Sequence, residues 1–122
     1  MKKLKNDNLK EYTDDCINIA YCVDNNYIKY CATSLYSILS NVNKNQKLSV
    51  FILHDGSIEQ QNFNKYSLIF KEFKNCKINF INVEKTKFAD FPLNRNYISF
   101  TTYFRLKIYD FVPNDIDKIL YI

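Results

Sequence analysis

Residues 17–27 limit the possible folds of this chain more than any other stretch does. They begin with a mostly apolar run, residues 17–23, whose β-branched and aromatic side chains predict a buried strand. The run stops abruptly at the polar residues 24–27, and a helical spacing of apolar residues follows over about 30–41. Open α/β sheets present ligand-binding side chains just after the carboxyl ends of such strands. Residues 24–27 are therefore a candidate ligand site, although the same pattern fits a turn that only caps the helix.

The rest of the chain repeats this alternation of strands and helices. The further predicted elements, in chain order, are a strand at 48–53, a helix at 57–73, a strand at 77–83, a helix at 99–111 and a strand at 118–122. This alternation is typical of a parallel sheet with helices on both faces, so the predicted fold class is α/β. The length suits one domain, predicted at residues 16–122, after a disordered tail at residues 1–15.

Local signals between these elements predict turns and loops. Ser57 and Gln60 match a capping box, in which each side chain would satisfy the other residue's amide at the start of the helix. The sequence His54-Asp55-Gly56 lacks a nucleophile nearby and is interpreted as a turn, not as a catalytic group. Residues 85–96 contain Phe91-Pro92, and the residue before a proline disfavours helix, so a loop is expected there.

Composition excludes several classes of protein. The single glycine, Gly56, argues against a phosphate cradle of the Rossmann or P-loop type, because both need several glycines. A net charge of +4 fits anionic ligands but is too small to indicate nucleic acid. Four cysteines without CxxC spacing and one histidine argue against zinc. Cys22 and Cys31 fall within apolar patterns and are predicted to be buried free thiols, which favours a reducing, cytoplasmic compartment. Neither a signal peptide nor a transmembrane segment is predicted.

Two polar clusters have the chemistry to bind a ligand. In residues 24–27, an aspartate or asparagine can accept hydrogen bonds from a base or ribose, and a tyrosine ring can stack on a base. The hydroxyls of Ser99, Thr101 and Thr102 fall in the first turn of a predicted helix, where free amides attract anions. Arg105 would add a planar cation for phosphate or sugar hydroxyls. A capped helix with a solvated arginine is the alternative interpretation of this second cluster.

Six segments occur in an order and at spacings that are typical of one enzyme family. They are Ile19–Tyr27, Ser34–Leu39, Ile52–Gly56, Phe91–Pro92, Ile98–Leu106 and Asp115–Ile122. Together they resemble glycosyltransferase family eight, the retaining, nucleotide-sugar-dependent enzymes that include bacterial lipopolysaccharide galactosyltransferases and glycogenin. Each segment alone is a weak signal, but the ordered set is specific and covers residues from about 17 to 122.

The resemblance implies a GT-A fold and transfer of a hexosyl group, with retention, from a UDP-sugar to a saccharide or glycolipid acceptor, as in lipopolysaccharide or surface glycan synthesis. The positions that match the family's donor-binding residues are Asp24, Asn26, Tyr27, Ser99, Thr102 and Arg105. The first three match positions that hold uracil and ribose, and the last three match the helix beside the donor sugar and diphosphate. The resemblance also implies Mn²⁺ or Mg²⁺, but it assigns no catalytic residue and no metal ligand in this chain.

The family's metal-binding Asp-x-Asp would follow directly after residues 120–122, with a later histidine ligand and the acceptor region beyond it. We therefore expect the chain as given to be an inactive N-terminal part that self-associates through its last strand, with any membrane contact residing in the region beyond. The alternative function is a non-catalytic nucleotide-binding or protein-interaction module. A receiver-like signalling domain is disfavoured, because Glu84-Lys85 follows the third strand where a phosphoacceptor aspartate is needed.

Overall fold

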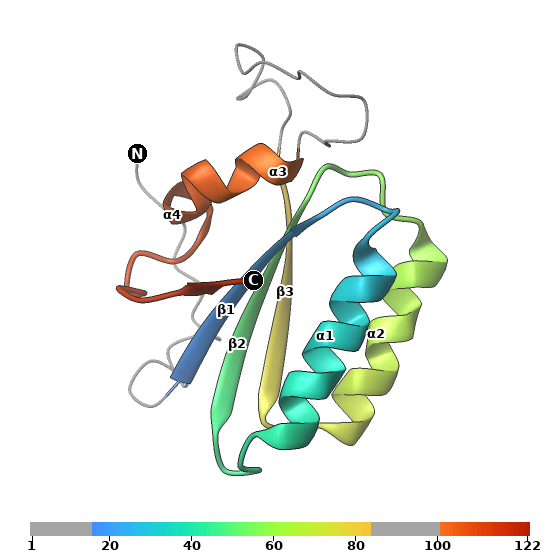
Figure 1. Ribbon diagram of the computed structural model, residues 1–122, viewed down its shortest axis with the longest axis vertical. Coiled ribbons are helices and arrows are strands. Elements are labelled where there is room, and N and C mark those ends of the chain that lie inside the picture. The colour runs from blue at the N-terminus through green and yellow to red at the C-terminus, as the bar shows by residue number, and fades with distance from the viewer. Residues whose placement is uncertain (1–15, 84–100) are drawn as a thin grey trace.

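The strands form a single parallel sheet. The computed structural model describes residues 16–83 and 101–122, so the predicted tail at 1–15, the predicted loop at 85–96 and Ser99 lie outside the described residues. The strands are β1 (Cys16–Val23), β2 (Lys47–His54), β3 (Cys76–Asn82) and β4 (Leu120–Tyr121). They lie in the order β3-β2-β1-β4, and every neighbouring pair is parallel (Figure 1).

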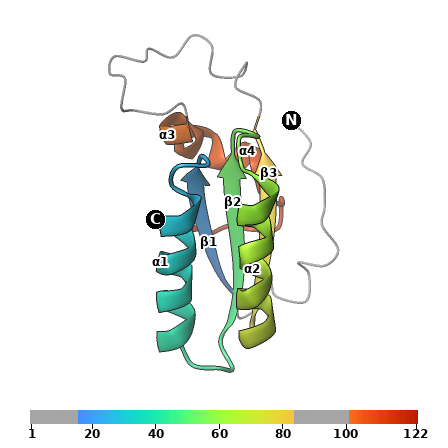
Figure 2. The ribbon, with the colours of Figure 1, turned by 90° about the vertical axis from the view of Figure 1, so that its right-hand side faces the viewer.

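Helices cover both faces of this sheet, which confirms the predicted α/β class. α1 (Ile28–Asn41) and α2 (Gln60–Glu72) pack on one face, against residues such as Ile19 and Val50 (Figure 2). The other face is covered by α3 (Thr101–Phe104), the 3₁₀ turn η3 (Arg105–Lys107) and α4 (Ile108–Phe111). Alternate residues of β1 enter the two cores, because successive side chains of a strand point to opposite faces.

The order of the strands changes direction at β1. The chain runs outward from β1 to β2 and β3, then crosses the other face of the sheet to add β4 on the opposite side of β1. The strand order therefore reverses between β1 and β4, and ligands of open α/β proteins bind outside the carboxyl ends of the strands at such a point. The loop after β1 opens at this point.

Three predicted elements differ in extent. The helix expected at 99–111 is divided into α3, η3 and α4, since Lys107 has φ −125° and ψ 19°. The second helix begins at Gln60, three residues later than expected, and the last strand is limited to two residues. Phe104 and Ile108 are both buried, so the apolar spacing that predicted one helix is satisfied across the 3₁₀ turn as well.

Among the residues that the structure describes, no helix has the length and apolar character needed to cross a lipid bilayer. All four cysteines, Cys16, Cys22, Cys31 and Cys76, are free thiols, which confirms the prediction made for Cys22 and Cys31. Cys31 is fully buried, whereas Cys22 is half-buried beside the second core.

Candidate functional site

The carboxylate of Asp24 organises the turn that follows β1. Its Oδ1 accepts hydrogen bonds from the backbone amides of Asn26 at 2.9 Å and Tyr27 at 3.1 Å. The backbone carbonyl of Asp24 accepts from the amides of Tyr27 and Ile28, which starts α1. Asp24 therefore does form the turn at the start of α1, as the alternative interpretation of residues 24–27 expected. Oδ2 makes no hydrogen bond with the described residues, which leaves one charged oxygen for a ligand donor.

The aromatic side chain of Tyr27 stands in solvent at the start of α1. Its exposed fraction is 53%, and its ring centroid lies 6.1 Å from that of Tyr30, at an interplanar angle of 50°. The Nζ of Lys29 lies 5.0 Å from the Tyr30 ring centroid. Tyr30 and Lys29 were not predicted as site neighbours, although a tyrosine pair three residues apart on a helix could have indicated the first. An exposed ring in this place can stack on a planar ligand.

Arg105 lies close enough to Cys22 of β1 and Tyr121 of β4 for its charge to act on both. Arg105 is exposed, and its positive charge lowers the pKa of two neighbouring groups, Cys22 and Tyr121, whereas burial raises both. Burial raises the pKa of Cys22 to about 12, and burial and the Cys22 thiol raise the pKa of Tyr121, whereas Arg105 lowers both. Tyr121 pairs with Ala20, which belongs to the same face of β1 as Cys22. The cation is therefore near the point where the strand order reverses.

Two further predicted residues receive no side-chain description. Ser99 lies outside the described residues, and for Thr102 the structure describes only its place in α3. Asn26 is exposed next to Tyr27. The structure thus places Asp24, Asn26 and Tyr27 in one turn and Arg105 in η3, near Cys22 of β1.

Asn25 connects the turn after β1 to the start of α2. Its Oδ1 accepts hydrogen bonds from the backbone amide of Glu59 at 2.9 Å and from Nδ2 of Asn62 at 2.8 Å. Its own backbone amide donates to Oγ of Ser57 at 3.1 Å. The sequence placed Asn25 in the polar cluster 24–27 but did not predict this tie, because the partners of Asn25 are more than thirty residues away and a local pattern carries no sign of them.

The predicted capping box is wrong. The N-cap of α2 is Glu59, which makes no side-chain capping hydrogen bond, and the hydroxyl of Ser57 donates to Oδ1 of Asp55 instead of capping the helix. The amide nitrogen of Ser57 donates to the same oxygen at 3.0 Å. The Asn25 side chain, from a different loop, takes the place of the expected cap.

The predicted turn at residues 54–56 is confirmed. His54 is buried at the end of β2, and its Nδ1 accepts a hydrogen bond from the amide of Gly56 at 3.1 Å. Gly56 has φ +84°, a conformation that favours glycine, and a Cβ there would lie 3.3 Å from Nδ2 of Asn82. Burial lowers the pKa of His54, while the neighbouring charge of Asp55 raises it. The histidine is thus a neutral turn residue.

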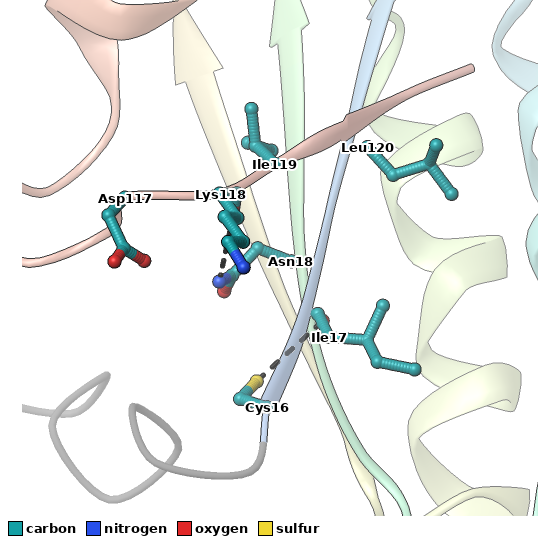
Figure 3. A pocket seen from close by; sticks show the side chains of 7 residues that line it. All are labelled: Cys16, Ile17, Asn18, Asp117, Lys118, Ile119 and Leu120. Carbon is teal, nitrogen blue, oxygen red and sulfur yellow. Dashed lines mark hydrogen bonds between the residues drawn. The ribbon is translucent and has the colours of Figure 1, made fainter.

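The described residues contain no group of three His, Cys, Asp or Glu side chains placed to hold a metal ion. The Mn²⁺ or Mg²⁺ implied by the sequence resemblance therefore does not fit any set of described side chains. A hollow of about 640 Å³ lies at the other end of β1, beside Asn18 and residues 117–120 (Figure 3). Nδ2 of Asn18 donates to the carbonyl of Lys118 there at 3.2 Å. This hollow contains none of the predicted site residues.

Comparisons with known proteins agree on one class of enzyme. Residues 18–122 match the sequence model of "Glycosyl transferase family 8". Lipopolysaccharide 1,3-galactosyltransferase of Salmonella typhimurium is 31% identical over 117 residues, which are 94% of this chain and 33% of that protein. Lipopolysaccharide glucosyltransferase WaaO of Escherichia coli is 31% identical over 109 residues, which are 88% of this chain and 30% of that protein.

A crystal structure of the galactosyltransferase LgtC, in complex with donor and acceptor sugar analogues, has a similar fold. The TM-score is 0.71 at 31% sequence identity, over 87% of this chain and 37% of that chain. This chain spans about a third of the length of the proteins it matches.

Proposed function

Because this chain belongs to glycosyltransferase family 8, we propose that it forms the donor-binding part of a bacterial enzyme that transfers a hexosyl group from a UDP-sugar to a saccharide acceptor with retention. The matches confirm the family and the GT-A type of α/β fold that the sequence predicted. Relatives named as lipopolysaccharide galactosyl- and glucosyltransferases support a saccharide or glycolipid of the cell surface as the acceptor. A cytoplasmic location, which free thiols favour, belongs to the same proposal.

One observation carries the proposal: the turn formed by Asp24, Asn26 and Tyr27 opens at the carboxyl end of β1, where the strand order reverses, and Arg105 faces the same strand. In our proposal, the free carboxylate oxygen of Asp24 accepts a hydrogen bond from the N3–H of uracil. The exposed ring of Tyr27 stacks on the base, with Asn26 beside the ribose.

The second half of the proposed site is cationic. Arg105 presents five N–H donors in a planar fork, which suits the hydroxyls of the donor sugar and the oxygens of the diphosphate. Ser99 and Thr102, at the start of the same segment, are proposed to contact the donor as well. The chemistry assigned to these residues is recognition and orientation of the donor.

A nuclear magnetic resonance titration tests the proposed ligand class. UDP should shift the amide signals of Asn26 and Tyr27 and the side-chain signal of Arg105, whereas ADP at the same concentration should shift them far less, because a purine presents a different edge to Asp24. Equal shifts with UDP and ADP, or none with either, would contradict the uridine assignment.

A further inference from the structure

We infer that Asn25 is a positioning residue, which holds the donor-binding turn in shape by tying it to the start of α2. The inference rests on the proposed function for the identity of the ligand, but the tie itself is a feature of the fold. Asn25 lies between Asp24 and Asn26 in sequence, yet its side chain bonds to Glu59 and Asn62 at the start of α2.

The tie consists of three hydrogen bonds across two loops. The Asn25 Oδ1 accepts from the Glu59 amide and from Nδ2 of Asn62, 34 and 37 residues further along the chain. A carbonyl oxygen has two lone pairs, so these two donors use its full capacity. The Asn25 backbone amide donates to Oγ of Ser57, 32 residues away. Side chain and backbone of one residue are therefore both held by the loop before α2 and by the first turn of that helix.

The second loop is itself fixed, so it can serve as an anchor. Both the amide and the hydroxyl of Ser57 donate to Oδ1 of Asp55. His54 holds the amide of Gly56 and contacts Phe63 of α2 edge-on, at 5.7 Å between ring centroids. Figures 1 and 2 both show the connections from β1 to α1 and from β2 to α2 at the same end of the molecule.

The hydrogen bonds of Asn25 stabilise both the start of α2 and the turn after β1. The N-cap residue of α2 makes no side-chain hydrogen bond of its own, and the Asn25 oxygen satisfies the otherwise orphaned Glu59 amide. In return, the turn after β1 gains an anchor outside itself, in addition to the local bonds of Asp24. A turn that contains three proposed ligand residues must be ordered before it binds, so its apparent affinity falls with the fraction of molecules in the ordered state.

Three variants separate positioning from general stability. Asn25→Ala removes the acceptor, whereas Asn25→Asp retains an oxygen that accepts from Glu59 and Asn62. Asn75→Ala is the matched control, because Nδ2 of Asn75 donates to the Gln46 carbonyl at 2.7 Å and ties two loops at the opposite end of the sheet. The experiment measures the Kd for UDP by calorimetry and, without ligand, the hydrogen exchange of the Asn26 and Tyr27 amides.

We expect Asn25→Ala to raise the Kd about fivefold to tenfold and to accelerate exchange of both amides at least about fivefold, as loss of a modest hydrogen-bond network predicts. Asn25→Asp should stay within about threefold of wild type in both measurements, and Asn75→Ala should leave both unchanged. If Asn25→Ala does not fold, Ser57→Ala takes its place, because it removes an exposed partner of the Asn25 amide. This variant should raise the Kd and the exchange rates of both amides about twofold.

The inference would be overturned if folded Asn25→Ala bound UDP and exchanged both amides as the wild type does. If Asn25→Ala does not fold, the same result for Ser57→Ala would overturn it. Equal changes in Asn75→Ala would also overturn it, because they would assign the effect to stability alone. A wild-type chain that does not bind UDP contradicts the proposed function instead, and the exchange measurement then still decides whether Asn25 holds the turn.

Discussion

The guanidinium of Arg105 lies close enough to the Cys22 thiol to lower its pKa, although burial raises that pKa to about 12. Arg105 is the first residue of η3, and Cys22 is the second-to-last residue of β1, so the two segments lie close together. Arg105 is exposed, but it follows the fully buried Phe104, and Ile108 is buried one turn later. Two apolar side chains in the second core therefore hold the backbone that carries the cation, so that Arg105 lies near Cys22 of β1 and Tyr121 of β4.

Arg105→Lys tests whether the shape of this cation matters. The substitution retains the charge and loses the planar fork, so we expect UDP-sugar binding to weaken by about 1 kcal/mol while binding of UDP alone changes less. Calorimetry with UDP, UDP-glucose and UDP-galactose measures the difference. Lys65→Gln, which removes an exposed charge on α2, is the control. Identical affinities for Arg105→Lys and wild type would identify Arg105 as a solvated surface residue.

A pair of substitutions at Asp24 separates its two roles. Asp24→Asn keeps an oxygen that accepts from the Asn26 and Tyr27 amides, so the turn should persist, but the charge is lost. We expect this variant to unfold at the wild-type urea midpoint and to bind UDP more weakly by about 1–2 kcal/mol. Asp24→Ala should also destabilise the fold, by about 1 kcal/mol, because the turn loses its acceptor. Unchanged UDP affinity in the folded Asp24→Asn protein would leave Asp24 as a turn residue alone.

The sequence predicted the sheet and its helices because their signals are local. The buried strand β2 reads as a continuous apolar run, and α1 shows its apolar spacing directly. The break at Lys107 carried no such signal, because Phe104 and Ile108 keep helical spacing across it. β4 was predicted longer than it is, since only two of its residues pair with β1.

The candidate site was also predictable only where its signals are local. The polar turn that ends β1 was visible in sequence, and the structure places it at the expected edge of the sheet. The tie from Asn25 to Glu59 was not visible, and the local signal at Ser57 pointed to the wrong cap. The proximity of Arg105 to Cys22 depends on how α3 and η3 pack on the sheet, which no spacing within the chain specifies.

Tyr66→Phe tests a second bond that supports the start of α1. The hydroxyl of Tyr66, which is buried in α2, donates to the carbonyl of Ile28 at 2.9 Å. Burial raises the pKa of Tyr66 well above its usual range, so the group remains a neutral donor. We expect the substitution to lower the free energy of unfolding by about 1 kcal/mol. Tyr36→Phe, which removes an exposed hydroxyl bonded to Glu72, should cost less than about 0.5 kcal/mol in the same urea titration.

His54 should make the stability of the fold depend on pH. Its Nδ1 accepts the Gly56 amide, so the folded state needs the neutral ring, and burial lowers its pKa below the usual value of 6.5 despite Asp55. The unfolded state therefore takes up the proton first as the pH falls. Stability from this group is complete above about pH 6.5 and declines as the pH falls toward the lowered pKa of the folded state, by at most about 1.4 kcal/mol per pH unit.

His54→Asn isolates that contribution, because an asparagine oxygen can accept the Gly56 amide but does not titrate in this range. Urea midpoints measured for both proteins between about pH 7.5 and about pH 5 should fall more steeply for wild type than for the variant. The carboxylates of the chain are common to both proteins, so their effect cancels in the comparison. Parallel curves would mean that the folded state tolerates a charged His54, and that the ring does not depend on its bond to Gly56.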